Sequence, residues 1–499
     1  MSRVRTAALA GVDGIPVEVE VRISSQLPRM EIVGLPEAAV RESAARVRAA
    51  LVAAGEKFPE HRVTVHLAPA ELRKSGAALD LPIAVATLAA HGRIETQALE
   101  GLALAGELAL DGRLRPVRGA LALALAVRDA GCGTLIAPHA NAAEAALARD
   151  LEVRAASDLT AVLAHLRGGE ALPVATGARL LEPASDVADL SDVRGQELAK
   201  RGLEVAAAGG HAALLVGAPG SGKTMLARRL PGFLPPLTWE EALEVTRIHG
   251  AVAPLAAPIV SRRPFRAPHH SASPAGLVGG GRPPRPGEVS LAHCGVLFLD
   301  ELPEFDRRAL ESLRQVLEDR RVVLVRAGGH VTFPADLQLV AAANPCPCGW
   351  LGSGRRDCRC DDGQIARYRA RISGPLLDRI DLHLRVQPLA WAELDLPPAR
   401  ETGSDATRAR VMAARARQLA RGVSSNARLP DRDLDCRVDA TSEARALLGR
   451  AVDGFGLSAR AARRVLRVAR TIADLAGETR TGPAAIAEAL GYRQDAGAA

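Results

Sequence analysis

Apolar and polar residues follow two regular patterns in the first third of the chain. Residues 15–22 and 62–67 alternate between apolar and polar side chains, which is typical of a strand with one buried face. Residues 37–55 have apolar positions at helical spacing and end at a glycine suited to a helix C-cap. Residues 81–90 are apolar enough for a buried helix. This mixture predicts one α/β domain over residues 1–170.

A different pattern begins near residue 193. Residues 212–216, 296–299 and 337–343 are short apolar runs separated by segments of helical character. Strands that are apolar on both faces are typical of a parallel sheet covered by helices on each side. We therefore predict a second α/β unit over residues 193–400.

Two further segments complete the predicted organisation. Residues 171–192 contain Pro173, Gly177 and Pro183 without a clear period, so we expect a linker there. Residues 401–499 are rich in Ala, Arg and Leu, and we expect helices only.

The strand predicted at residues 212–216 leads into a loop of the pattern G-x-x-x-x-G-K-[ST]. Glycines let the backbone N–H groups surround a phosphate chain, while Lys223 reaches the β and γ phosphates and Thr224 binds Mg²⁺. The chain has only four lysines, so a chance match is rare. The pattern predicts a site for ATP and Mg²⁺ made by Gly217, Ala218, Pro219, Gly220, Ser221, Gly222, Lys223 and Thr224.

Polar side chains follow the other apolar strands. Asp300 and Glu301 come directly after residues 296–299, which would place Asp300 beside Mg²⁺ and Glu301 beside the attacking water. Asn344 can position this water from the far side, although Asn before a proline is also an ordinary turn residue. Arg379 can neutralise charge on the γ-phosphate, but with about sixty arginines its position alone does not select it.

Four of the seven cysteines lie close together at Cys346, Cys348, Cys358 and Cys360. Two C-x-C pairs separated by nine residues can close a tetrahedral zinc site, although the common spacing is C-x-x-C. Reduced loop cysteines or a redox pair are the alternatives. A zinc ion would stiffen a basic loop that carries Arg355 and Arg356.

Basic residues gather in two further places. Residues 246–289 exceed what one helix and one strand need, and we expect a basic loop there, which inside a ring ATPase would line the central pore. Its basic residues are Arg262, Arg263, Arg266, His269, His270, Arg282 and Arg285. The histidine pair is expected to be solvated or hydrogen-bonded rather than metal-binding. Near the C-terminus, five arginines recur at helical spacing. The face that they form is either solvated or buried between subunits, or else it contacts DNA. They are Arg460, Arg463, Arg464, Arg467 and Arg470.

Composition narrows the class of partner and the compartment. The net charge of +7 fits a polyanion partner such as DNA. Aromatic residues make up only 2%, so base stacking is not expected to dominate, and contacts would go to phosphates with little sequence specificity. Neither a signal peptide nor a membrane-length apolar run is apparent, and the clustered cysteines favour a reducing compartment. We expect a soluble cytoplasmic protein.

Together these residues resemble the magnesium-chelatase-like AAA+ ATPases, and specifically the ComM/YifB family of bacterial competence-related proteins. The resemblance covers nearly the whole chain. Its most specific strings lie at residues 32–37, 67–74, 265–271, 344–349, 373–381 and 469–475.

The resemblance implies further roles. Asn344 would be sensor 1, Arg379 a finger acting on the ATP of the neighbouring subunit, and Arg460 sensor 2 on a C-terminal helical lid. A finger that acts on a neighbour implies a ring, and a homohexamer is expected. Members of the family are thought to be DNA helicases that drive branch migration during uptake and recombination of foreign DNA.

The N-terminal domain resembles the proteolytic domain of Lon-type proteases, a fold of the ribosomal S5 domain 2 type, most clearly at residues 106–119. The serine and lysine of the Lon dyad align with Ala78 and Leu121, and Lys74 and Ser75 lie nearby at the wrong offsets. A nucleophile without its base is inert. We expect a scaffold or ring-forming module and not a peptidase.

Two other functions share such an ATPase core. The motor subunit of a metal chelatase would drive metal insertion into a porphyrin, but it needs neither the Lon-like domain nor the cysteine array. A regulatory or chaperone AAA+ protein would use aromatic pore loops, and the basic segment offers only Phe265. The leading prediction is an ATP-dependent DNA-translocating motor.

Overall fold

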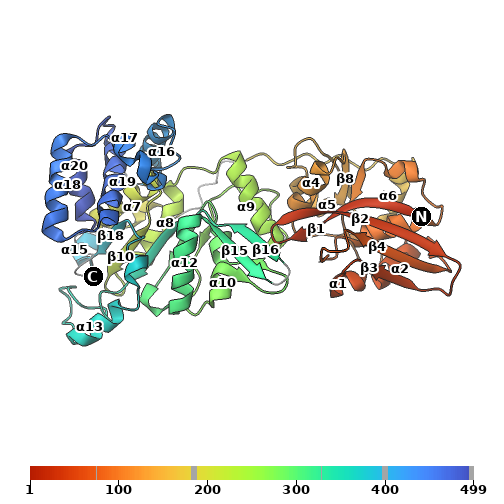
Figure 1. Ribbon diagram of the computed structural model, residues 1–499, viewed down its shortest axis with the longest axis horizontal. Helices are drawn as coiled ribbons and strands as arrows, with labels where there is room; N and C mark the ends of the chain where they lie inside the picture. Colours follow the sequence, from red (N-terminus) through yellow and green to blue (C-terminus); the bar gives the residue numbers. More distant parts are fainter. Residues whose placement is uncertain (75, 181–187, 327–328, 396–402, 494–499) are drawn as a thin grey trace.

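The computed structural model describes residues 1–499 except 75, 181–187, 327–328, 396–402 and 494–499. Figure 1 shows three parts in a row, with an N-terminal α/β part on the right, a second α/β part in the centre and a group of helices on the left. Residues 181–187 of the predicted linker, and residues 396–402 at the predicted boundary to the last part, lie outside the described residues.

The N-terminal part is built on a mixed seven-stranded sheet of order β3-β4-β2-β1-β5-β8-β9. Its strands are β1 (Ser2–Ala10), β2 (Asp13–Ser24), β3 (Met30–Val33), β4 (Arg62–Ala68), β5 (Leu102–Leu104), β8 (Thr134–Pro138) and β9 (Glu152–Ala156). Strand β2 pairs antiparallel with β1 and β4, and the remaining neighbours are parallel. The strands predicted from alternation at residues 15–22 and 62–67 are confirmed as β2 and β4.

Helices cover both faces of this sheet. They are α1 (Ala38–Arg41), α2 (Ser43–Ala53), α3 (Asp80–Ala90), α4 (Ala120–Asp129), α5 (His139–Ala145) and α6 (Leu159–Leu166). Side chains of a strand alternate between faces, so Val4 and Ala8 join the core under α3, whereas Ala7 joins the core under α4. The helix predicted over residues 37–55 is two helices, and its second part ends just before Gly55, whose φ of +77° is left-handed.

The central part contains a five-stranded parallel sheet of order β11-β14-β17-β10-β18. The strands are β10 (Ala213–Gly217), β11 (Phe265–Arg266), β14 (Val296–Leu299), β17 (Gln338–Ala343) and β18 (Leu382–Val386). Three of them confirm the apolar runs that predicted a parallel sheet. In β10, Leu215 faces a core that holds Leu226 of helix α8 (Lys223–Phe233), while Leu214 faces a core that holds Leu313 of helix α12 (Arg307–Asp319).

The helices of this part lie on both faces of the sheet. Their bounds are α7 (Glu197–Gly209), α8 (Lys223–Phe233), α9 (Trp239–Val252), α10 (Pro274–Val278), α11 (Glu288–Leu291), α12 (Arg307–Asp319), α13 (Asp362–Arg369), α14 (Gly374–Leu377) and α15 (Trp391–Leu394). A hairpin of β15 (Arg321–Arg326) and β16 (Gly329–Pro334) precedes β17. A mixed α/β fold with a parallel sheet is therefore confirmed.

The expectation of one basic loop over residues 246–289 is wrong. The segment begins inside α9, adds the edge strand β11 to the sheet, and then forms α10, the hairpin of β12 (Gly279–Gly280) and β13 (Arg285–Pro286), and α11. Two of its arginines serve the fold. Arg263 donates to the carbonyl oxygens of Pro235 and Cys294, and Arg266 pairs with Glu288 at 2.7 Å.

The last part is helical over its described residues, as predicted. Its helices are α16 (Ser404–Ala420), α17 (Leu434–Val438), α18 (Ser442–Phe455), α19 (Ala459–Ala476) and α20 (Pro483–Gly491). Val468 and Ile472 of α19 and Ile486 of α20 share one hydrophobic core with α7 and α8. The C-terminal helices therefore pack on the same face of the central sheet as α8, the helix that follows the glycine loop.

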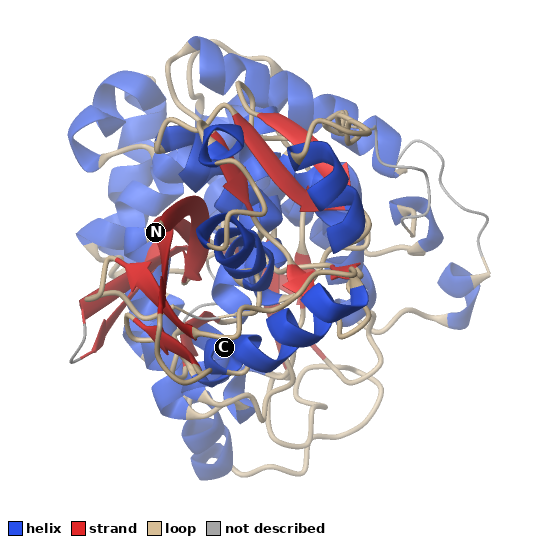
Figure 2. Cartoon of the chain, turned by 90° about the vertical axis from the view of Figure 1, so that its right-hand side faces the viewer, coloured by secondary structure: helices blue, strands red, loops and turns tan. Residues whose placement is uncertain are grey.

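The N-terminal and central parts touch at the β1–β2 turn and at α9. Figure 2 views the molecule from the N-terminal side. A Cβ on Gly11 in this turn would stand 2.8 Å from Val331 Cγ1 of β16, so the turn packs closely against that strand. Asp13 pairs with Arg247 of α9 at 3.0 Å. The backbone N–H of Gly119 donates to a carbonyl oxygen of α9 over 2.7 Å.

Candidate nucleotide site

The glycine-rich loop lies where the sequence places it, between the end of β10 and the start of α8. Gly220 and Gly222 have left-handed φ values of +73° and +96°, which residues with a side chain rarely adopt. Lys223 folds back over the loop, and its Nζ donates to the carbonyl oxygens of Gly217 at 2.7 Å and Ala218 at 3.0 Å. The loop is thus curled around its own lysine.

The residues of this loop fit a bound phosphate chain. Among the described residues, the buried Oγ of Ser221 has no hydrogen-bond partner, although an unpaired buried hydroxyl is costly. Space around Gly220 and Gly222 is open: apart from each glycine and its two chain neighbours, no described atom lies within 4 Å of where a Cβ would stand. The N-terminal end of α8, which favours anions, begins at Lys223. An anion in this space would accept from the loop N–H groups, from Ser221 and from Lys223.

A hydroxyl and a carboxylate lie together next to the loop. Thr224 Oγ1 donates to Asp300 Oδ2 over 2.7 Å, and Asp300 Oδ1 accepts from the N–H of Glu301 at 3.0 Å. Hard oxygen ligands of this kind are what Mg²⁺ prefers. Thr224 and Asp300 would hold the ion, whose charge would polarise the bound phosphates.

Parallel strand order explains why these side chains meet. β10 lies beside β17, which lies beside β14, so the carboxyl ends of all three strands reach one edge of the sheet. There Asn344 Oδ1 accepts a hydrogen bond from Lys223 Nζ at 3.1 Å. Burial lowers the pKa of Lys223, and the nearby charges of Asp300 and Glu301 oppose that shift. The predicted loop, carboxylates and amide are therefore brought together.

One functional candidate was missed by sequence reasoning. His270 Nδ1 lies 3.3 Å from the Glu301 carboxylate, and the rings of His269 and His270 stand 4.0 Å apart. His270 follows β11, which pairs in parallel with β14, so the residues after both strands meet at the same sheet edge. The two-residue length of β11 hides this neighbour from any pattern of alternation. Glu301, whose φ is +53°, is thus held by a partner from the segment that we predicted as a pore loop.

Arg379 and Arg460 meet each other but not the glycine loop of their own chain. Arg379 forms an ion pair with Glu318 at the end of α12 and donates to the carbonyl oxygen of Pro375 at 2.7 Å. Arg460 pairs with the same Glu318 at 2.6 Å. Both arginines line a cavity of about 430 Å³ that also contains Arg464, whereas Asn344 lines a different one.

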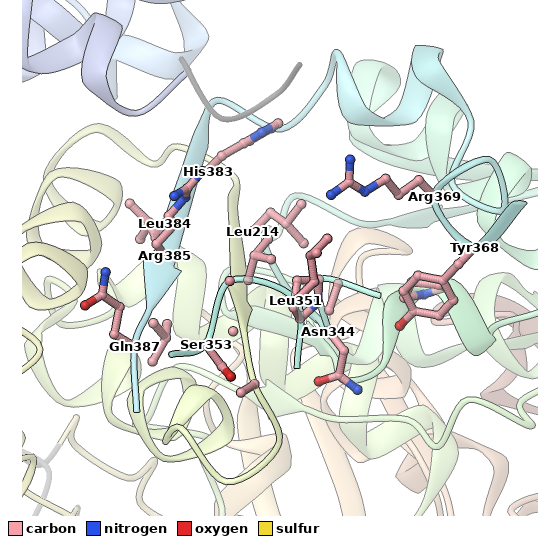
Figure 3. A pocket seen from close by; sticks show the side chains of 18 of the residues that line it. Leu214, Asn344, Leu351, Ser353, Tyr368, Arg369, His383, Leu384, Arg385 and Gln387 are labelled. Carbon is pink, nitrogen blue, oxygen red and sulfur yellow. The ribbon is translucent and has the colours of Figure 1, made fainter. Parts of the chain in front are cut away.

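The cavity beside the glycine loop has a volume of about 200 Å³. Figure 3 shows His383 and Arg385 of β18 facing Tyr368 and Arg369 of α13 across it. Gly217 and Ala218 of the loop, Asn344, and residues 351–353 of the cysteine loop form other parts of its wall. The cysteine loop is therefore part of the surroundings of the nucleotide site.

The arginine row of α19 is occupied by partners within the chain. Arg470 is buried and pairs with Asp474 at 2.9 Å, and Arg464 pairs with Asp381 at 2.6 Å. Arg463 and Arg467 both pair with Asp431. These pairs favour the structural interpretation of the row over contact with DNA.

In the N-terminal part, the positions aligned with the Lon dyad carry no nucleophile or base. Leu121 is fully buried in α4, and Ala78 is half-buried. Lys74 is buried and donates to the carbonyl oxygen of Pro69, and desolvation lowers its pKa. Ser75 lies outside the described residues.

Three family models match the chain. They are described as magnesium chelatase, subunit ChlI, over residues 189–394, as subunit ChlI of Mg-chelatase over residues 19–141, and as magnesium chelatase, subunit ChlI C-terminal, over residues 401–493. YifB of Salmonella typhimurium is 45% identical over 98% of this chain and 96% of its own length. Competence protein ComM of Haemophilus influenzae is 44% identical over 98% of this chain and 97% of its own length.

The chain belongs to the ComM/YifB family of magnesium-chelatase-like AAA+ ATPases. YifB of Escherichia coli is a further relative, 44% identical over 99% of this chain and 97% of its own length. Membership of this family supports an ATPase of the AAA+ type, for which ATP and Mg²⁺ are the suggested ligands. Within the described residues, no helix combines the length and apolarity needed to cross a bilayer.

Proposed function

We propose that this ATPase is a DNA-translocating motor that works as a homohexameric ring and promotes branch migration during DNA uptake and recombination. The observation that carries the proposal is the separation of two halves of the ATPase machinery. Lys223, Asp300 and Asn344 gather at one edge of the sheet, and Arg379 and Arg460 gather at Glu318 in a different cavity. A single chain would then be a poor catalyst, and a ring would join the two halves.

Each side chain has a defined task in this proposal. Lys223 and the loop N–H groups bind the β and γ phosphates, and Thr224 and Asp300 hold Mg²⁺. Glu301 orients the attacking water and takes its proton, with Asn344 as sensor 1 on the other side. Arg379 and Arg460, the latter as sensor 2, act on nucleotide held by the neighbouring subunit. We assign α16–α20 as the helical lid that carries Arg460.

Support for DNA as the partner comes from charge and from a relative. The net charge is +7, and Arg282 and Arg285 are exposed on the hairpin β12–β13. Such arginines bind phosphates without reading sequence. A full-length relative is named a competence protein. DNA bound in this way is expected to be single-stranded or branched.

The N-terminal part fits a Lon-like scaffold without peptidase activity, because Ala78 and Leu121 replace the dyad. The seven cysteines are free among the described residues, in keeping with a reducing cytoplasm as the compartment.

Hydrolysis of ATP with and without DNA tests the proposal. The rate should rise when forked or four-way DNA is added, and Lys223→Ala should show neither basal nor stimulated hydrolysis. The second candidate, which the family models suggest, is the motor subunit of a metal chelatase. It would be identified by an ATP hydrolysis rate that does not change with DNA but rises with a porphyrin and its metal. Stimulation by unfolded polypeptides alone would point to a chaperone.

A further inference from the structure

Four cysteines with no part in ATP hydrolysis lie around one point beside the nucleotide site. The Sγ atoms of Cys346 and Cys348 are 3.4 Å apart, and each lies 3.7 Å from Cys358 Sγ. All four Sγ atoms, including that of Cys360, lie within 4.8 Å of one another. Zinc–sulfur bonds of about 2.3 Å in a tetrahedron place sulfurs about 3.8 Å apart. The observed separations match this geometry and are longer than the roughly 2.05 Å of a disulfide.

We propose that Cys346, Cys348, Cys358 and Cys360 bind one Zn²⁺, and that this ion clamps their loop against the phosphate-binding loop. Nucleotide affinity then depends on the metal. The second half of this inference rests on the nucleotide site assigned above, and the first half stands on the cysteines alone.

The loop supplies the charge and the hydrogen bonds that a zinc–thiolate centre needs. Zn²⁺ with four thiolates carries a charge of −2. Three arginines and one aspartate, a net charge of +2, lie between Cys348 and Cys360. The N–H of Cys348 donates to Cys360 Sγ at 3.4 Å, which is the kind of contact that orients a metal ligand. The Arg356 guanidinium lies 4.7 Å from the centre of the Trp350 ring and braces the loop.

Contacts with the phosphate-binding loop give the site its second role. Gly349 has a φ of +81°, and a Cβ there would stand 2.6 Å from Pro219 Cδ, so the two loops touch without room for a side chain. Asn344 is two residues before Cys346, and Leu351 lines the same cavity as Gly217. A metal that fixes Cys346 therefore fixes both the sensor amide and the surface against which Pro219 rests.

Metal content tests the first half. Protein purified under reducing conditions without a histidine tag should contain about one zinc per chain by elemental analysis. After chelation, Co²⁺ should restore the site and give the intense visible bands of tetrahedral thiolate coordination. Cys358→Ser with Cys360→Ser should lose both signals, while Cys436→Ser, at an exposed cysteine outside the cluster, should keep them. Reduced wild-type protein that holds no zinc and gives no tetrahedral cobalt spectrum overturns the site.

Nucleotide affinity tests the second half. Chelated wild-type protein should bind a fluorescent ADP analogue about tenfold more weakly than zinc-loaded protein, and added Zn²⁺ should restore binding. This comparison uses the native chain, so it holds even where the double serine variant fails to fold. Cys360→His should keep zinc and affinity. Equal affinity with and without bound zinc overturns the clamp. Failure of DNA to stimulate the zinc-loaded protein would instead count against the motor function and leave the metal site standing.

Discussion

Replacing Arg379 with alanine should strongly reduce ATP hydrolysis at the neighbouring subunit's site while hardly changing the stability of the fold. The guanidinium is buried against Glu318, whose side chain is 46% exposed and also pairs with Arg460 at 2.6 Å. Loss of Arg379 therefore leaves Glu318 with a partner. A half-exposed ion pair contributes about 1 kcal/mol or less, so the variant should fold and melt only slightly below wild type.

The expected effect on hydrolysis is much larger. A finger that stabilises charge on the γ-phosphate accelerates hydrolysis about 10³-fold or more, which is roughly 4 kcal/mol of the activation barrier. Arg379→Ala should therefore bind ATP with wild-type affinity, because Lys223 and Thr224 are untouched, and lose most turnover. The matched control is Arg445→Ala, since Arg445 pairs with Asp435 at 3.0 Å on the surface of α18, where no role in hydrolysis is expected.

Mixing distinguishes a finger that acts on a neighbour from one that acts within its own chain. In equal mixtures of Arg379→Ala and Lys223→Ala chains, about one interface in four joins an intact glycine loop to an intact finger. Hydrolysis should exceed that of either variant alone, as measured by phosphate release. Sedimentation or native mass spectrometry establishes that mixed rings form. Mixed rings that form but hydrolyse no more ATP than either variant alone would refute action on a neighbour.

Four further predictions concern other residues. Glu301→Gln should bind ATP as wild type does but hardly hydrolyse it, because only the proton acceptor is lost, and wild-type turnover would show that another group is the base. His270→Ala should release Glu301 from its 3.3 Å contact, which should raise ATP hydrolysis without DNA and reduce its stimulation by DNA. If the ratio of the hydrolysis rates with and without DNA stays the same, His270 does not link DNA binding to hydrolysis. Burial, reinforced by a nearby arginine and opposed by two aspartates, lowers the pKa of His383 to about 4. The unfolded chain binds a proton at this histidine at a higher pH than the folded chain does, so the free energy of unfolding should fall by about 2 kcal/mol between pH 7.5 and pH 5. Urea titrations at these two pH values should show a smaller loss for His383→Leu. Arg282→Glu with Arg285→Glu should weaken DNA binding and reduce the slope of log affinity against log salt by about 2, whereas an unchanged slope would place the DNA elsewhere.

The sequence predicted those features that depend on local pattern. The strand, glycine loop and helix around Lys223 are contiguous, so spacing alone identified them, and the parallel sheet followed from three apolar runs. Asn344 became meaningful through strand order, which places its amide 3.1 Å from Lys223 Nζ. The resemblance, rather than the residue pattern, selected Arg379 from many arginines.

Other features depend on contacts between distant segments, and a sequence pattern does not contain them. The strand β11 has two residues, too few to show alternation, so its segment was predicted as a loop and the contact of His270 with Glu301 went unseen. The regular arginines of α19 suggested an exposed basic face, but Asp381 and Asp431 from other segments occupy three of them.

Branch migration by the purified protein tests the central claim most directly. A labelled four-way junction with homologous arms would be incubated with the wild-type protein and ATP, and dissociation into two duplexes followed on a native gel. The account predicts ATP-dependent dissociation by wild type and none by Lys223→Ala or Glu301→Gln, although both variants still bind the junction. A wild-type protein that binds the junction and hydrolyses ATP but leaves the four arms in place would contradict the claim that this ATPase moves along DNA.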